Sequence, residues 1–556
     1  MKKKKRKNEP NTQLKNKVNA DLDINIKTFR DIGSFIKRNK LYLIIFFIFT
    51  WIIYANIVTG DFVNLDDYSK ILTGPEYYNL SESLKSLDLY RIIMTVFIKA
   101  FGVNSSALHV LAIFSHILNG IFVFFLIHIL FGKKFATLGT LMFLSHPANT
   151  EVLSWHAGYP YALRANIIIP TLIFFALFKK SKNKIFLYMS GLLYTFALVF
   201  LRGGGWVLIT PFLVVLMDQF ILEEKVEFKN IVQYLPYLVP SLVFAVVLIP
   251  TFLKGRVESL ETLYYVDTET ATPLLNRIPY TIYMQYKTLF YPINLSIYHE
   301  GKYITPVEYT FMIFITIGVI FGIFYFWKKN RAISGLMLMI IFSILPSFSP
   351  VIVAWIAAER YQYIASIFSS IIIITSLVWF DKKILKNRRW DEKTISKFVL
   401  YSSIVIITLY SVRTVFRNND LRNSKNLWTA SKKTAPYSYR VYNNMGDVLA
   451  NEGDLDGALE NFKRSVALKP DYADAVHNIG HIYMVKKDYV RAIKYLEQSL
   501  QMNPRLYPSA YKLGVIHTEK NDLEKAKKYF EQCLSIDPNN ADCINGLQNV
   551  TSVVSK

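Results

Sequence analysis

Long apolar stretches recur through the first three quarters of this 556-residue chain, and they constrain its fold more than any other feature. Hydrophobic residues make up 52% of the sequence. A helix of about 20 mainly apolar residues can cross a bilayer. Eleven stretches are candidates, near residues 41–58, 107–131, 135–148, 161–178, 185–201, 205–221, 232–252, 307–326, 333–348, 362–380 and 397–413. These stretches predict an all-α, polytopic membrane bundle, in which 135–148 is the shortest span.

Basic residues indicate how these spans are oriented. Residues 1–40 carry 13 Lys and Arg against four acidic residues, and this tail directly precedes the first apolar stretch. Lys and Arg are enriched in cytoplasmic loops. Further basic clusters occur in every second predicted loop, at residues 133–134, 179–184, 225–229, 328–331 and 382–393. We therefore expect a cytoplasmic N-terminus, an odd number of spans and an extracytoplasmic C-terminus, and we expect the net charge of +23 to face lipid rather than nucleic acid.

The last quarter of the chain contains a repeat of 34 residues. Gly446, Gly480 and Gly514 are separated by this step, and so are the sets Ala458/Ala492/Ala526, Phe462/Leu496/Phe530 and Pro470/Pro504/Pro538. Small residues allow two antiparallel helices to pack closely, a large residue fills the gap, and Pro ends the second helix. This is the tetratricopeptide (TPR) pattern. Three repeats run to Pro538, and residues 541–550 are expected to form a capping helix.

The repeats carry two further features. Asn444 and Asn478 occupy equivalent positions on the first helices, where they are candidates to bind the backbone of an extended acceptor peptide, or simply to form a solvated helix face. The two cysteines of the chain, Cys533 and Cys543, are too few for a disulfide framework or a zinc site, and we expect two free thiols rather than a bridge.

These features divide the chain into four predicted regions. They are a basic cytoplasmic tail (1–40), a transmembrane domain (41–413), a linker (414–437) and an extracytoplasmic TPR domain (438–550).

The loops predicted to face outside contain unusual polar residues. An acidic pair, Asp66–Asp67, follows the first span within ten residues. Such a pair can act as a general base or ligate a divalent metal, although Asp is also common as a cap of loops and short helices. Burying a charged residue at membrane depth costs free energy, and such residues are usually functional. Glu359 and Arg360 lie next to an apolar span, so we expect them to be functional.

Five short motifs occur in order on this outside face. The acidic pair is followed by Tyr90-Arg91, then His146-Pro-Ala-Asn-Thr-Glu151, Tyr291-Pro-Ile-Asn-Leu-Ser296 and Glu359-Arg-Tyr-Gln-Tyr363, with the TPR repeats after them. In this order they resemble the TMTC (transmembrane and TPR-containing) O-mannosyltransferases and their prokaryotic relatives, which are assigned to the GT-C glycosyltransferases. The Lys-, Asn- and Ile-rich composition favours a prokaryotic member.

The resemblance implies a membrane glycosyltransferase. Such an enzyme moves mannose or another hexose from a polyprenyl-phosphate donor to Ser or Thr of an acceptor protein on the extracytoplasmic face. No phosphate-binding loop for a soluble nucleotide is present, since Gly203–Gly205 does not lead into Lys-Ser/Thr.

Roles for individual residues follow from this expectation. Asp66 or Asp67 is the candidate general base. Arg360, and after it Arg91, are candidates for the donor phosphate, because a guanidinium can engage phosphate oxygens bidentately, although either side chain could instead snorkel to the interface. Four more residues are candidates for orienting donor or acceptor: His146, Glu151, Glu359 and Tyr361. A divalent metal at the acidic pair is possible, but no complete ligand set is present in the sequence.

Two other classes of function fit part of the sequence. A membrane-anchored TPR scaffold for envelope assembly needs the repeats but not the charged motifs. A transporter or flippase for lipid-linked sugars predicts charges deep within several spans. An enzyme requires the acidic pair and Arg360 to converge on one outside cavity, whereas a scaffold does not.

Overall fold

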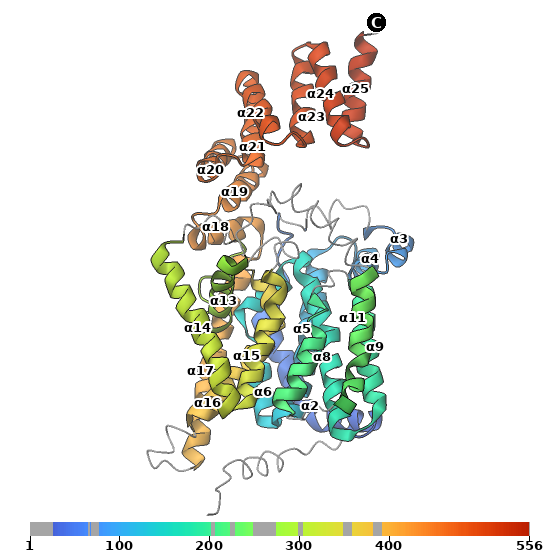
Figure 1. The fold of residues 1–556 in the computed structure, drawn as a ribbon. Helices are drawn as coiled ribbons and strands as arrows, with labels where there is room; N and C mark the ends of the chain where they lie inside the picture. The colour runs from blue at the N-terminus through green and yellow to red at the C-terminus, as the bar shows by residue number, and fades with distance from the viewer. Residues whose placement is uncertain are drawn as a thin grey trace, which may run out of the picture. The chain divides into compact units, whose positions relative to one another are not determined.

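The computed structural model describes residues 26–64, 67, 77–201, 206–222, 228–247, 274–298, 304–348, 358–381 and 392–554. Every regular element within these ranges is a helix, so the all-α prediction is confirmed (Figure 1). The chain divides into two compact units. The first comprises Met1–Leu295 with Ile304–Asn423, and the second comprises Ser296–Tyr303 with Ser424–Lys556.

The first unit is a bundle of apolar helices. Six segments are long and apolar enough to cross a membrane: Phe29–Ile57, Ser105–Phe131, His156–Ser181, Pro306–Lys329, Arg331–Phe348 and Lys397–Asp420. The helices in these segments are α2 (Phe29–Tyr54), α5 (Ser105–Phe131), α8 (Tyr159–Ser181), α14 (Pro306–Lys329), α15 (Arg331–Ile344) and α17 (Glu392–Asp420). A multi-pass membrane protein is thereby supported, while the number of crossings and their orientation stay predictions.

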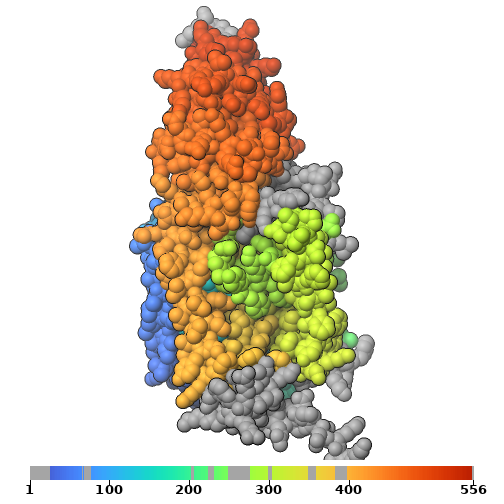
Figure 2. Space-filling view, turned by 90° about the vertical axis from the view of Figure 1, so that its left-hand side faces the viewer, coloured from blue at the N-terminus to red at the C-terminus, as the bar shows by residue number. Residues whose placement is uncertain are grey.

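The other predicted spans form shorter helices. They are α6 (Lys133–Leu144), α9 (Lys184–Phe200), α10 (Thr210–Leu216) with the π-helical turn η7 (Met217–Ile221), α11 (Leu235–Val247) and α16 (Ala365–Phe380). One helix of this unit, α13 (Leu274–Phe290), lies in the large loop where no element is predicted. It packs beside α14 on one face (Figure 2).

Helices α5 and α8 form the centre of the bundle. In their most apolar windows 67% and 72% of the residues are buried, against 22% for α14. Helix α5 packs against α2, α6 and α8. Asn104 starts this helix by accepting the N–H of Ala107, as an N-cap residue does. The polar side chains that α5 carries inward are therefore held in a packed environment.

The second unit contains the TPR repeats. Its paired helices are α19 (Tyr439–Asn451) with α20 (Leu455–Leu468), α21 (Ala473–Val485) with α22 (Tyr489–Met502), and α23 (Tyr507–Glu519) with α24 (Leu523–Ile536), followed by α25 (Ala541–Val554). Position 446 requires glycine, because a Cβ at Gly446 would lie 2.5 Å from the ring of Phe462. These paired helices confirm the predicted C-terminal TPR solenoid.

The boundary between the units differs in detail from the predicted linker. Residues 414–420 continue α17, and α18 (Ser424–Thr434) covers most of the remainder. Trp428 of α18 is fully buried and stacks on Tyr298, with ring centroids 5.8 Å apart. A short segment of the large loop thus belongs to the TPR unit.

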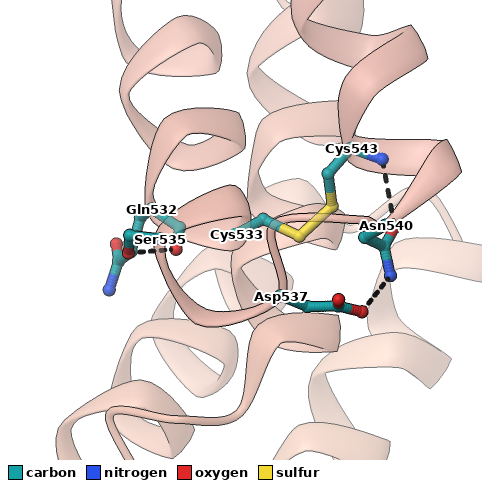
Figure 3. Close-up of a disulfide and its surroundings, with 6 residues drawn as sticks. All are labelled: Gln532, Cys533, Ser535, Asp537, Asn540 and Cys543. Carbon is teal, nitrogen blue, oxygen red and sulfur yellow. Dashed lines mark hydrogen bonds between the residues drawn. A yellow bond between two sulfur atoms is a disulfide. The ribbon is translucent and has the colours of Figure 1, made fainter.

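The expectation of two free thiols is wrong. Cys533 and Cys543 form a disulfide that joins α24 to the capping helix α25 (Figure 3). The N–H of Cys543 also donates to Oδ1 of Asn540, which starts the capping helix close to Cys533. Sequence spacing alone could not show that the two helices bring the sulfur atoms together.

Candidate functional site

The loop that contains Asp66 and Asp67, here called the acidic loop, is fixed to the bundle by the buried carboxylate of Asp67. Asp67 is fully buried. Its Oδ1 accepts the backbone N–H of Ala157 at 2.9 Å, and its Oδ2 accepts that of Val63 at 3.4 Å. Asp67 therefore ties the loop to the turn η5 (His156–Gly158), whereas Asp66 lies outside the described residues.

Two histidines lie beneath this loop. His109 of α5 and His156 of η5 face each other with ring centroids 4.3 Å apart. Nε2 of His156 lies 2.9 Å from Oγ of Ser105, and that hydroxyl donates to the carbonyl oxygen of Gly60 in the loop. Nε2 of His109 is buried without a hydrogen-bond partner among the described residues. A buried nitrogen without a partner needs an explanation, of which a functional role is one.

The residues before the turn hold a buried ion pair. Glu151, in the short helix α7 (Thr150–Ser154), is fully buried. Its Oε2 accepts the backbone N–H of Arg360 at 2.9 Å, and its Oε1 accepts the guanidinium of the same residue. The guanidinium also lies over the ring of Trp155, 4.9 Å from its centroid. Two predicted site residues are thus brought together, and they neutralise each other.

A second buried pair adjoins the first. Glu359 and Arg360 are consecutive in the turn η10 (Glu359–Gln362). Glu359 accepts two hydrogen bonds from Arg417 of α17, one of them from Nε at 3.1 Å. Both side chains are at most 2% exposed. Arg417 was missed in the sequence, because an arginine near the end of an apolar stretch is typical of an interfacial anchor.

Aromatic rings border the ion pairs. Tyr361 is buried, and its ring centroid lies 5.1 Å from that of Trp206 and 5.9 Å from that of Tyr161. The rings of Trp155 and Tyr361 each lie 4.9 Å from the Arg360 guanidinium. Ion pairs are stronger in such low-dielectric surroundings than in water.

The other two predicted site residues lie at the border of this region. Nδ1 of His146 accepts the N–H of Ala148, so Nε2 donates to the carbonyl of Leu289 at 2.9 Å. With both ring nitrogens engaged, His146 anchors the end of α13. Arg91 is half-buried in α4 (Leu89–Phe101), and its neighbour Tyr90 donates to the carbonyl of His156.

Asp67 and Arg360 therefore both contact one short segment of the chain. Residues 150–158 contact the acidic loop through Ala157 and the turn η10 through Glu151. No group of three or more His, Cys, Asp or Glu able to hold a metal ion occurs in the part of the chain that the structure describes.

Asn478 of the TPR unit is part of a polar cluster. Asn478 donates to Oδ1 of Asn443 and Oδ1 of Asp447, both at 3.1 Å. Burial and the charge of Asp474 raise the pKa of Asp447 to about 7. Asn444 is half-buried one residue from Asn443. The cluster includes Asp447 and Asn443, which the 34-residue pattern did not single out.

Comparison with known families supports the repeats. A tetratricopeptide repeat model matches residues 473–506 and 507–540, and a TPR repeat model matches residues 446–487. The chain therefore contains TPR repeats. The crystal structure of yeast Tom70 aligns with 76% of this chain and 92% of its own, at 13% identity, but its TM-score of 0.22 is too low to support a shared fold.

Curated relatives match part of the chain. They include the protein O-mannosyl-transferase tmtc2 of Xenopus laevis, 26% identical over 129 residues, and human protein O-mannosyl-transferase TMTC3, 25% identical over 169 residues. These matches cover 22% and 29% of this chain. They span only 14% and 17% of the length of the two relatives. The chain is therefore similar to protein O-mannosyl-transferases over part of its length.

Proposed function

We propose that this protein is a membrane glycosyltransferase that moves mannose or another hexose from a polyprenyl-phosphate donor to Ser or Thr of acceptor proteins. One observation carries the proposal: the acidic loop and the Glu359–Arg360 turn both bind to residues 150–158. A TPR scaffold has no need of this convergence. The partial similarity to protein O-mannosyl-transferases supports the same reaction class.

The two aspartates have different roles in this proposal. Both carboxylate oxygens of Asp67 accept backbone N–H groups, so Asp67 is a positioning residue that fixes the loop. Asp66 is then the general base that removes the proton of the acceptor hydroxyl as its oxygen attacks the anomeric carbon. The bond between that carbon and the donor phosphate breaks, the phosphate leaves with the electron pair, and the single displacement inverts the anomeric configuration.

Positive charge stabilises the departing phosphate. A guanidinium has five N–H donors, and Glu151 accepts one from the Arg360 side chain. In the proposal Arg360 is held by Glu151 in an orientation that presents other donors to the phosphate, with Arg91 as the second candidate. His146, Glu359 and Tyr361 support this arrangement through their packing. A divalent metal bound with Asp66 is a variant of this mechanism.

The location of the reaction follows from the predicted topology. The proposed site and the TPR unit are extracytoplasmic. The disulfide between Cys533 and Cys543 supports this side for the TPR unit, because disulfides persist in oxidising compartments. We propose that the TPR unit binds the acceptor polypeptide through Asn444 and through the cluster that contains Asn478.

The test is sugar transfer by the purified full chain in detergent. Labelled polyprenyl-phosphate sugars and a pool of Ser/Thr peptides are the substrates. Asp66→Asn is expected to lower kcat by about 100-fold or more, since this is the usual contribution of a general base. Asp61→Asn is the matched control, because Asp61 is exposed in the same loop and has no role in the proposal.

The roles of the two aspartates are separated by a second readout. Asp67→Asn is expected to lower activity and also to make the loop more susceptible to proteolysis, whereas Asp66→Asn leaves the loop protected. A folded wild-type protein that transfers no sugar from any donor would favour the scaffold. Equal activity of Asp66→Asn and wild type would remove Asp66 from the mechanism.

A further inference from the structure

A cavity with basic walls lies in the first unit, here called the membrane unit, at the end away from the acidic loop. It has a volume of about 560 Å³, within the range of small-molecule sites. Its lining comes from four helices, with Phe35, Arg38, Asn39 and Tyr42 of α2, His128 of α5, Lys133, Lys134, Thr137 and Leu138 of α6, and Leu400 of α17.

This cavity is distinct from the candidate glycosyltransfer site. Helix α5 connects the two, with Ser105 beside the acidic loop and His128 in the cavity. The 23 residues between them correspond to about 35 Å at 1.5 Å per residue. A ligand in the cavity therefore cannot be the sugar donor held at the candidate site.

The described walls of the cavity are basic. Arg38, Lys133 and Lys134 line it, and no Asp or Glu is among its described lining residues. Neither Arg38 nor Lys133 forms an ion pair with another described residue. Arg38 and Lys134 are exposed and Lys133 is half-buried, so the described wall of the cavity presents positive charge to an anion.

Two other features indicate that the cavity is built to receive a ligand. His128 is only 5% exposed, and its Nδ1 has no hydrogen-bond partner among the described residues. The ammonium group of Lys133 is positioned over the Tyr42 ring, 4.4 Å from its centroid. A phosphate oxygen would supply the missing partner of His128 and the counter-charge of Lys133.

The walls of the cavity are also apolar. Phe35, Leu138 and Leu400 adjoin the basic side chains, and the whole cavity is within the membrane unit. Basic pockets between membrane helices on the cytoplasmic side bind anionic headgroups. We infer that this cavity binds a phosphate-bearing headgroup, and that a membrane lipid supplies it. The inference does not depend on the proposed transfer reaction.

Lipid retention by the purified full chain tests this inference. The protein is incubated with equal amounts of phosphatidylglycerol and phosphatidylcholine, and bound lipid is measured by native mass spectrometry. Wild type is expected to retain phosphatidylglycerol in preference. Arg38→Gln combined with Lys133→Gln is expected to reduce that retention roughly tenfold or more, since each basic residue contributes substantially to headgroup binding.

A control variant isolates the cavity from general surface charge. Lys328→Gln with Lys329→Gln removes the same charge from exposed positions at the end of α14 and is expected to retain lipid as wild type does. In separate samples, glycerol phosphate and inorganic phosphate replace the lipid. Binding of these soluble phosphates, lost in the cavity variant, would also support the headgroup site but assign it a soluble source.

If the cavity variant fails to fold, crosslinking of wild type with a photoreactive phosphatidylglycerol tests the inference instead. Crosslinks to wild-type peptides of α2, α5 or α6 at the cavity support the inference. Crosslinks elsewhere, or equal retention of both lipids by wild type, would overturn it. Equal loss of retention in the cavity variant and the control variant would also overturn it.

Discussion

Arg360 donates both its backbone N–H and its guanidinium to the carboxylate of Glu151. The two residues are 209 positions apart in the sequence, and the contact joins η10 to α7. Because both groups are almost completely buried, each charge depends on the other for compensation. The pair is therefore a structural element as well as a candidate for donor binding.

Removal of one partner of this pair should destabilise the protein. Arg360→Met leaves the Glu151 carboxylate buried without its counter-charge, and the expected loss is about 3–5 kcal/mol. Glu151→Gln with Arg360→Met should cost much less than the sum of the two single changes. Thermal unfolding in detergent measures the cycle. Additive losses would show that the two side chains do not depend on each other.

Arg360→Lys separates structure from phosphate binding. Lys keeps the positive charge beside Glu151 but cannot form a planar, bidentate contact with a phosphate. We expect a nearly unchanged unfolding temperature together with a KM for the polyprenyl-phosphate donor raised roughly tenfold. An unchanged KM would limit Arg360 to a structural role.

A similar prediction applies to the neighbouring ion pair of Glu359 and Arg417. Arg417 lies outside the sequence motifs. Arg417→Met should destabilise the bundle by about 3–5 kcal/mol, because Glu359 then remains buried without its partner. Asp420→Asn is the matched control. Asp420 is 31% exposed and lies 3.7 Å from Arg417, so its loss should cost less than about 1 kcal/mol. Similar unfolding temperatures for the two variants would contradict this view.

The sequence predicted the features that depend on local pattern. Long apolar stretches located most of the bundle helices, and the 34-residue step located the repeats. Both signals come from residues that are close together in the sequence. Helix α13 was missed because it is amphipathic, with Arg277 and Gln285 within it, and lacks a long apolar run. Its position depends on packing against α14.

Sequence reasoning named candidate residues for the site but could not predict their contacts. Glu151 and Arg360 were candidates for different tasks, and only tertiary structure shows that they pair. His156 was not selected, although a histidine ten residues after His146 within the same apolar region was an available signal. The contacts of Asp67 depend on Ala157, which is 90 residues away.

The disulfide should stabilise the end of the TPR unit. It closes a loop with a sequence separation of 10, for which chain entropy gives about 2–3 kcal/mol. Cys543→Ser should therefore increase hydrogen exchange in α25 while leaving α19 unchanged. A reducing agent should have the same effect on wild type and no further effect on the variant. Equal exchange in α25 before and after reduction would contradict a stabilising bridge.

Asp447 should make the stability of the TPR unit depend on pH. Its pKa is raised from 3.8 to about 7 by burial and by Asp474. The folded unit therefore binds a proton that the unfolded chain has released between about pH 4 and pH 7, and stability falls as pH rises through this window. We expect Asp447→Asn to remove this loss.

Hydrogen exchange of α19 and α21 in the full chain measures the effect. At pH 8 the amides of Asp447→Asn should be protected roughly tenfold or more above those of wild type, because one unit of pKa corresponds to a factor of ten in the equilibrium. At pH 4 the two proteins should exchange alike, since the carboxyl is then protonated in the folded unit. Asp471→Asn, at an exposed position before α21, is the control and should follow wild type at both pH values. If Asp447→Asn also follows wild type at pH 8, the Asp447 carboxyl is not the group that couples folding to pH.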